Sequence, residues 1–173
     1  FDAIIGNFPY IEQEIIETGK DEEYKKFITK TLADEWKKEY PDLFVNGDTR
    51  LSGQADIYAY LFFHAASFLT NEGRMGIVTS NSWLGAAFGY ELQKFFLKKF
   101  KLVAIVESRC EPWFLDAKVN TVFTILERVS EDERQEREDN LVRFVQIKKP
   151  LEKLINKDIK FSADRWFKLR NIV

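Results

Sequence analysis

Cysteine and histidine are almost absent from this chain of 173 residues, which contains one of each. A lone cysteine excludes internal disulfide bonds, and one cysteine with one histidine cannot supply the ligands of a structural zinc site. We therefore expect no bound metal. No apolar run approaches the roughly 20 residues of a membrane-spanning helix, and the first residues do not resemble a signal peptide. These absences predict a cytoplasmic protein with no membrane partner.

Glycine-rich turns are missing as well. The eight glycines are scattered along the chain, and no Gly-x-Gly sequence follows a predicted strand. Such a turn is the usual means of holding a nucleotide-like cofactor at the end of a strand. The chain also begins at Phe1 and not at a methionine. We interpret it as a segment of a longer protein.

Hydrophobic residues make up 45% of the chain and include 16 phenylalanines, which predicts a globular domain. The net charge of −2 is unevenly distributed, because residues 140–173 carry nine basic and three acidic side chains. A basic tail can bind phosphates, although a solvated lysine-rich surface explains the charge equally well. We divide the chain into a domain at 1–150 and a basic linker at 151–173.

The hydrophobic periodicity alternates between strands and helices. Strands are expected at 1–6, 74–80, 102–106, 119–126 and 142–147, and helices at 21–40, 55–69, 90–100 and 150–155. This order predicts an α/β fold with a mostly parallel sheet and an antiparallel hairpin at its end, formed by 119–126 and 142–147. The charged run at 130–139 is expected to be a solvated turn or a frayed helix. The last residues, including Trp166, carry no pattern from which a fold is predicted.

The first ten residues are the most informative stretch. An apolar run with β-branched Ile4 and Ile5 predicts a short buried strand, which ends in the turn Asn7-Phe8-Pro9-Tyr10. In open α/β sheets, ligands bind at the carboxyl ends of the strands. An amide, a backbone carbonyl and an aromatic ring at that point can hold a flat heterocycle that carries an exocyclic amine.

This turn resembles the Asn-Pro-Pro-Tyr catalytic motif of amino-methyltransferases that use S-adenosylmethionine. The preceding Phe-Asp-Ala-Ile-Ile-Gly is similar to the strand before that motif in N6-adenine DNA methyltransferases, most closely those of type IIG restriction–modification enzymes and related phage-defence methylases. Phe8 stands where the family usually has the first proline. The resemblance implies the C-terminal half of a Rossmann-like S-adenosylmethionine-dependent methyltransferase domain, with residues 1–150 as its catalytic half.

Later segments match the family in the same order, through about residue 127. Residues 55–60 resemble its helix with Asp-Leu-Tyr, and 73–84 resemble its strand ending in Pro-Asn-Ser-Trp-Leu, with Ser80 in place of the proline. Residues 113–122 resemble Val-Phe-x-Asp-Ala-x-Val-Asn-Thr, whose aromatic packs against the flipped-out base. That aromatic falls on Phe114, with Trp113 as the alternative. Without the resemblance, these segments, including Tyr58, Tyr60 and Phe62, are simply core.

The motif suggests how an amine could be methylated. The lone pair of adenine N6 is delocalised into the ring, so two acceptors aimed at its N–H groups favour the geometry that attacks a methyl sulfonium. The candidate acceptors are the Asn7 side-chain oxygen and the Phe8 carbonyl. Pro9 would stiffen the turn, while Tyr10 and Phe114 would stack on the extruded base. No general base is required, because the amine can lose its proton after transfer.

The implied cofactor, S-adenosylmethionine, would meet only part of its site here. Asn7 and Pro9 would contact its methionine end, and the main binding motif would lie outside the chain. The implied partners are double-stranded DNA and the remaining domains of the same polypeptide, namely a cofactor-binding half and a target-recognition domain that the linker at 151–173 approaches. We expect the chain alone neither to bind the cofactor tightly nor to methylate.

Several alternatives stay open. The same turn serves amine methyltransferases that act on cytosine N4, on RNA or on a protein glutamine amide. Phe8 also allows a catalytically impaired module that is kept for binding DNA or a partner. A cytosine C5-methyltransferase is disfavoured, because its nucleophile is a cysteine in a proline–cysteine turn and Cys110 lies in Arg-Cys-Glu-Pro.

Overall fold

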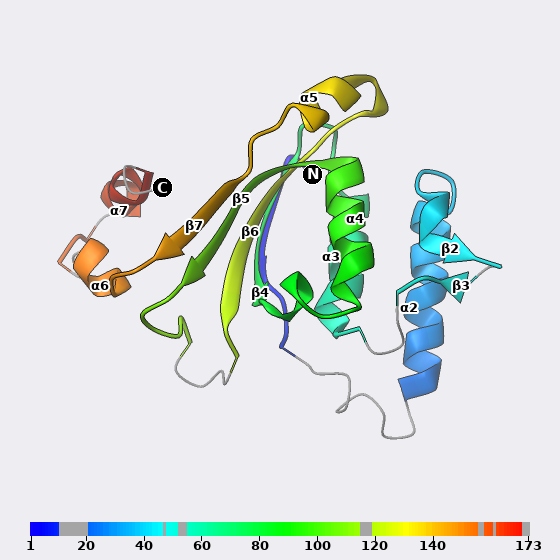
Figure 1. Cartoon of the computed structure of the whole chain (residues 1–173), viewed down its shortest axis with the longest axis horizontal. Coiled ribbons are helices and arrows are strands. Elements are labelled where there is room, and N and C mark those ends of the chain that lie inside the picture. Colours follow the sequence, from blue (N-terminus) through cyan, green and yellow to red (C-terminus); the bar gives the residue numbers. More distant parts are fainter. Residues whose placement is uncertain are drawn as a thin grey trace.

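The computed structural model describes residues 1–10, 21–46, 48–51, 55–114, 119–155, 158–160 and 162–170. Its centre is a five-stranded sheet in the order β1-β4-β6-β5-β7 (Figure 1). The strands of this sheet are β1 (Ala3–Asn7), β4 (Arg74–Ser80), β5 (Phe100–Ser108), β6 (Thr121–Arg128) and β7 (Arg143–Ile147). The helices are α2 (Asp21–Trp36), α3 (Ile57–Ser67), α4 (Gly89–Lys99), α5 (Arg134–Glu138), α6 (Leu151–Leu154) and α7 (Ser162–Arg170). Short elements complete the set: β2 (Phe44–Val45), β3 (Asp48–Thr49) and the 3-10 helices η1 (Pro41–Leu43), η2 (Ser82–Leu84) and η3 (Glu131–Glu133).

Four of the five strands run in the same direction. β1 is parallel to β4, β7 is parallel to β5, and β6 lies between β4 and β5 and is antiparallel to both. The α/β class is therefore confirmed, with a mixed sheet in which the central β6 runs against the other four strands. The carboxyl ends of β1, β4, β5 and β7 share one edge of the sheet, which places the turn after β1 where ligands are expected.

The predicted hairpin between 119–126 and 142–147 is wrong. β7 pairs with β5 at the edge of the sheet, and β6 is a central strand with Val122 and Leu126 fully buried. β6 pairs with the edge of β5 that faces β4, and β7 pairs with the outer edge of β5. The charged run between β6 and β7 forms η3 and α5, with a capping box between Ser130 and Glu133.

One face of the sheet is covered by α3 and α4, and α2 lies on the far side of these helices (Figure 1). The layer between them is largely aromatic and its large side chains are fully buried: Trp36, Phe62, Phe63, Trp83, Phe95, Phe96 and Phe100. Edge-on pairs fix their orientation, such as Trp36 on Phe95 with ring centroids 4.9 Å apart. The Trp36 indole Nε1 also donates to the Phe63 carbonyl at 2.9 Å, which ties α2 to α3.

Arg128, at the end of β6, closes the C-terminal end of α3. Its guanidinium donates to the carbonyls of Ala66 and Leu69 at 3.1 and 2.7 Å and pairs with Glu39. It also stands over the Trp36 ring, 5.4 Å from the centroid. These contacts add a charged donor to carbonyls at the end of a helix, and they bind the sheet to two helices at once.

The opposite face of the sheet is only partly covered. Ala104, Val106 and Ile147 form a second, smaller core, against which Leu151 and Leu154 of α6 pack. Beside it lies an apolar groove of about 680 Å³ that reaches Val78 and Phe123. Its further lining residues are Arg74, Val106, Trp113, Ile125, Arg143, Ile147, Leu151 and Arg170. Ile5 of β1 is 86% exposed, so apolar surface continues to the edge strand.

The last residues, from which no fold was predicted, contain α7. Arg165, Lys168 and Arg170 are exposed on this helix. No helix in the described part of the chain is long and apolar enough to cross a membrane. The same residues contain no group of three or more His, Cys, Asp or Glu side chains placed to hold a metal ion.

Candidate functional site at the carboxyl edge of the sheet

The turn that follows β1 is held against the neighbouring strand. Asn7 is the last residue of β1 and lies opposite Val78 of β4. The backbone N–H of Phe8 then donates to the Val78 carbonyl at 3.1 Å, which extends the pairing one residue beyond the strand. Since paired residues in neighbouring strands share a face, Asn7 points to the side of Val78 and Phe123, where the groove opens.

Asn7 is exposed and its side-chain amide has a defined partner. The Tyr10 hydroxyl donates to Asn7 Oδ1 at 2.6 Å. Burial raises the pKa of the Tyr10 hydroxyl, against the lowering effect of the bond to Asn7. The hydroxyl therefore keeps its proton at neutral pH and remains a donor.

The two aromatic residues predicted to stack on a base are neighbours, although they lie far apart in the sequence. The ring centroids of Tyr10 and Phe114 are 6.0 Å apart and the planes are inclined by 50°. Phe114 is 37% exposed, so part of its ring is available to a ligand. The alternative residue, Trp113, packs against the second core of Ala104, Val106 and Ile147. The structure thus brings Phe114, and not Trp113, to Tyr10.

Phe8 has a structural task at its position. Its half-buried ring packs edge-on against Phe62 of α3, with centroids 5.3 Å apart and planes inclined by 74°. The side chain therefore points into the main core, away from the face that carries Asn7. Pro9, the next residue, is exposed. The departure from the proline of the resembled motif is compensated by a ring contact and by a backbone hydrogen bond that proline could not make.

Replacing Phe8 by proline is therefore expected to destabilise the turn and not to improve it. The variant loses both the N–H donor to Val78 and the ring on Phe62, and we expect about 2–4 kcal/mol less stability to unfolding. Urea unfolding followed by circular dichroism measures the effect. Phe8→Leu is the matched control, because it keeps the N–H and most of the apolar contact and should cost about 1 kcal/mol. Equal stability of Phe8→Pro and the original protein would contradict this role.

A polar network at the end of β4 was not anticipated from the sequence. The Tyr58 hydroxyl lies 3.1 Å from Ser82 Oγ, which in turn lies 2.6 Å from Ser80 Oγ and donates to Asp56 at 3.3 Å. Burial raises the pKa of the Asp56 carboxyl, partly offset by hydrogen bonds from Ser82 and Tyr58. Tyr58 is buried as predicted, but the pattern of apolar residues could not show that its hydroxyl joins the start of α3 to the turn after β4.

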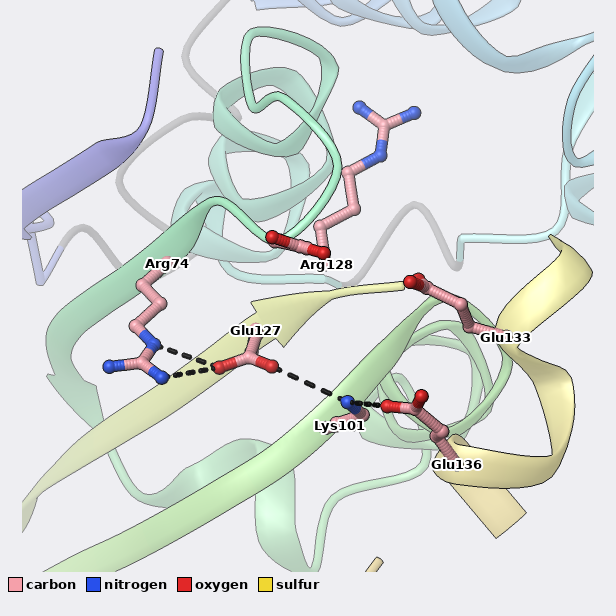
Figure 2. Close-up of a pocket in the computed structure, with 7 residues that line it drawn as sticks. Arg74, Lys101, Glu127, Arg128, Glu133 and Glu136 are labelled. Carbon is pink, nitrogen blue, oxygen red and sulfur yellow. Dashed lines mark hydrogen bonds and ion pairs between the residues drawn. The ribbon is translucent and has the colours of Figure 1, made fainter. Parts of the chain in front are cut away.

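Charged side chains gather around a cavity of about 220 Å³. This cavity lies at the amino ends of β4 and β5, opposite the turn after β1. Figure 2 shows Glu127 of β6 between two cations: Arg74, whose Nε donates at 2.8 Å, and Lys101, whose Nζ lies 3.5 Å away. Lys101 also pairs with Glu136 of α5, while Arg128 points away from this chain of charges. The cations here are matched by carboxylates and join β4, β5, β6 and α5. The cluster stabilises the sheet modestly and offers no set of free donors to a ligand.

The described residues match only part of a site for a nucleotide-like cofactor. Asn7 and Pro9 are exposed after β1 and could contact such a molecule. The sequence contains no glycine-rich turn to hold the rest of it. What the site does present is an amide oxygen, an ordered turn and two aromatic rings, which is a set suited to a flat ring with an amine.

Comparisons with known proteins identify the family and the fold. The model of the Eco57I restriction-modification methylase family matches residues 1–114. The Type II methyltransferase M.BstVI of Geobacillus stearothermophilus is 30% identical over 107 residues, which cover 62% of this chain and 16% of that protein. The chain therefore spans about a sixth of this relative.

Two crystal structures show the same fold. A protein described as a class I S-adenosylmethionine-dependent methyltransferase, from Listeria monocytogenes, has a TM-score of 0.56 and 15% identity, over 98% of this chain and 42% of that chain. The methyltransferase subunit of a type I restriction-modification system from Streptococcus thermophilus has a TM-score of 0.55 and 18% identity, over 98% of this chain and 31% of that chain. The expected Rossmann-like methyltransferase fold is confirmed. With two thirds of its length matched by the family model, the chain belongs to the Eco57I restriction-modification methylase family.

Proposed function

We propose that this chain forms the base-binding half of a DNA methyltransferase that transfers a methyl group from S-adenosylmethionine to adenine N6, within a restriction–modification or phage-defence enzyme. The observation that carries the proposal is the exposed Asn7 amide oxygen at the carboxyl end of β1, with the rings of Tyr10 and Phe114 beside it. The family membership supports the reaction type, and the adenine is inferred from the resemblance of the turn after β1.

The residues of this turn would act on the target amine. Asn7 Oδ1 and the Phe8 carbonyl accept hydrogen bonds from the two N–H groups of the exocyclic nitrogen, which favours the form whose lone pair points at an electrophile. Tyr10 and Phe114 hold the plane of the extruded base, at roughly 1–3 kcal/mol for each stacking ring. The cofactor supplies the electrophilic methyl group. Because these groups are in place before the base arrives, they act mainly through orientation.

The cofactor site and DNA recognition require further segments of the enzyme. In the proposed enzyme, a cofactor-binding segment would cover the exposed Ile5 and the apolar groove on the same face of the sheet, and would complete the contacts of Asn7 and Pro9 with S-adenosylmethionine. The basic residues of α7 would lie near DNA phosphates, on the way from the catalytic half at 1–150 to a recognition domain. The boundary of the linker at 151–173 stays a prediction.

The proposal is tested by mapping the product. The complete enzyme is incubated with DNA and S-adenosylmethionine carrying a labelled methyl group, and the digested DNA is analysed by mass spectrometry. We expect label in N6-methyladenine at one short sequence, and none in RNA or protein. Label in N4-methylcytosine would favour the closest alternative. If no nucleic acid or protein is labelled while the cofactor binds, the chain is part of an impaired binding module.

A further inference from the structure

The side chain of Asn7 presents a problem that the sequence does not reveal. Its amide has an oxygen on one side and an NH₂ group of nearly equal size on the other. The proposed reaction needs the oxygen toward the target amine, because a reversed amide would set donors against donors. Asn7 is exposed, so burial does not choose between the two orientations. The structure must select one by other means.

Tyr10 provides that selection. In the part of the chain that the structure describes, its hydroxyl is the one group bonded to the Asn7 amide, with Oη 2.6 Å from Oδ1. The phenol gives its proton to the amide oxygen, whereas a reversed amide would place NH₂ there and make the phenol oxygen the acceptor. A phenol donates more strongly than it accepts and an amide oxygen is a strong acceptor, so the observed orientation forms the stronger hydrogen bond. The amide oxygen has two lone-pair positions. Tyr10 uses one of them and leaves the second for another donor.

The hydroxyl itself is held in place. The Tyr10 ring is half-buried and touches the ring of Phe114, with centroids 6.0 Å apart. The turn that carries Tyr10 is fixed at Phe8 by the hydrogen bond to Val78 and by the contact with Phe62. Burial also raises the pKa of the Tyr10 hydroxyl, so this group keeps its proton and remains a hydrogen-bond donor at neutral pH. Ring and hydroxyl therefore have separable contacts.

From this geometry we propose that the Tyr10 hydroxyl is a positioning group that fixes the orientation of the Asn7 amide, with Oδ1 toward the target amine. The inference rests on the proposed function and adds to it a second task for Tyr10, distinct from stacking on the base. The hydroxyl does not touch the reacting atoms. It acts through Asn7, by keeping the fraction of correctly oriented amide close to one.

Tyr10→Phe in the complete enzyme separates the two tasks, because it keeps the ring and removes the hydroxyl. We expect kcat to fall about twofold, because the two orientations of an amide without this partner become about equally populated. The affinity for DNA and the fluorescence of 2-aminopurine at the target position should not change, since both report stacking and extrusion. Tyr40→Phe is the matched control: that hydroxyl is buried and has no hydrogen-bond partner among the described residues. An unchanged kcat for Tyr10→Phe would overturn the proposal.

A second background tests whether the hydroxyl acts through Asn7. In Asn7→Asp both side-chain oxygens are acceptors, so orientation no longer matters. We expect Tyr10→Phe to leave the rate unchanged in this background, measured under single-turnover conditions. A penalty as large as in the original enzyme would show that the hydroxyl acts elsewhere. Loss of all turnover in Asn7→Asp would also overturn the proposal, because one oriented oxygen would then not be what the site requires.

Different results would contradict the proposed function and the positioning role of Tyr10. If the original enzyme methylates no amine, or if removing the Asn7 side chain leaves its rate intact, then the proposed function is wrong. If Asn7 is essential while Tyr10→Phe is silent, then only the positioning role is wrong.

Discussion

Replacing Asn7 by alanine is expected to lower kcat for methyl transfer by roughly 10²- to 10³-fold, the usual cost of one preorganised hydrogen-bonding group at a reacting centre. The variant loses the acceptor at the end of β1 and leaves the Phe8 carbonyl as the remaining one. Because Tyr10 and Phe114 stay in contact, binding of the base should change much less than the rate. The experiment therefore separates chemistry from binding.

The measurement is the single-turnover rate of labelled methyl transfer to the mapped site, together with the affinity for DNA. Asn71→Ala serves as the matched control, since Asn71 is exposed in the turn before β4, at the opposite edge of the sheet. We expect the control to behave as the original enzyme and both variants to unfold at the same temperature. A loss of less than tenfold in Asn7→Ala would show that the amide oxygen is not the principal acceptor.

Among the glycines that the structure describes, Gly89 is expected to be the one whose replacement by alanine destabilises most, at a cost of about 3 kcal/mol or more. A Cβ at this first residue of α4 would lie 1.8 Å from the carbonyl oxygen and 2.6 Å from the carbonyl carbon of Trp83. Trp83 cannot easily move away from the added methyl group. Trp83 is 1% exposed and its ring packs edge-on against Phe96 with centroids 5.4 Å apart. We expect α4 to shift or the protein to unfold.

Gly85, four residues earlier, is a control within the same connection. A Cβ there has no heavy atom within 4 Å, and the backbone φ of −129° is open to any residue. Gly85→Ala should therefore change stability by no more than about 1 kcal/mol, with a small gain as the expected sign. Urea unfolding of the two variants side by side measures the difference. Similar stability of both would mean that the approach of α4 to Trp83 is not rigid.

The elements that carry local patterns were predictable from the sequence. Ile4 and Ile5 indicated a strand, and Pro9 marked the turn after it, because these signals depend on neighbouring residues alone. The predicted burial of that strand was wrong, because β1 lies at the edge of the sheet and Ile5 is 86% exposed. The position of β6 was not predictable in the same way. Its buried Val122 and Leu126 indicate a central strand, but periodicity does not say which strands lie beside it.

In the candidate site too, the sequence does not reveal which side chains contact one another. A family resemblance singled out the turn after β1 and Phe114, and the structure brings Phe114 to Tyr10. The hydrogen bond between Tyr10 and Asn7 could not be read in advance, since it depends on side-chain torsions at the end of a proline-containing turn. The hydroxyl network of Tyr58, Ser80 and Ser82 was hidden for a related reason: buried tyrosines and serines look like core until their partners are known.

The place of β6 between β4 and β5 also determines the order in which the sheet can be completed during synthesis on the ribosome. β4 and β5 are made first, yet neither can pair with the other in the native arrangement, because β6 separates them. Until residue 128 has left the ribosome, both strands keep an unpaired apolar edge, the kind of surface that attracts wrong partners. The sheet therefore cannot close until β6 is made. A nascent chain that pauses before β6 exposes two unpaired strand edges and is most prone to pair them wrongly.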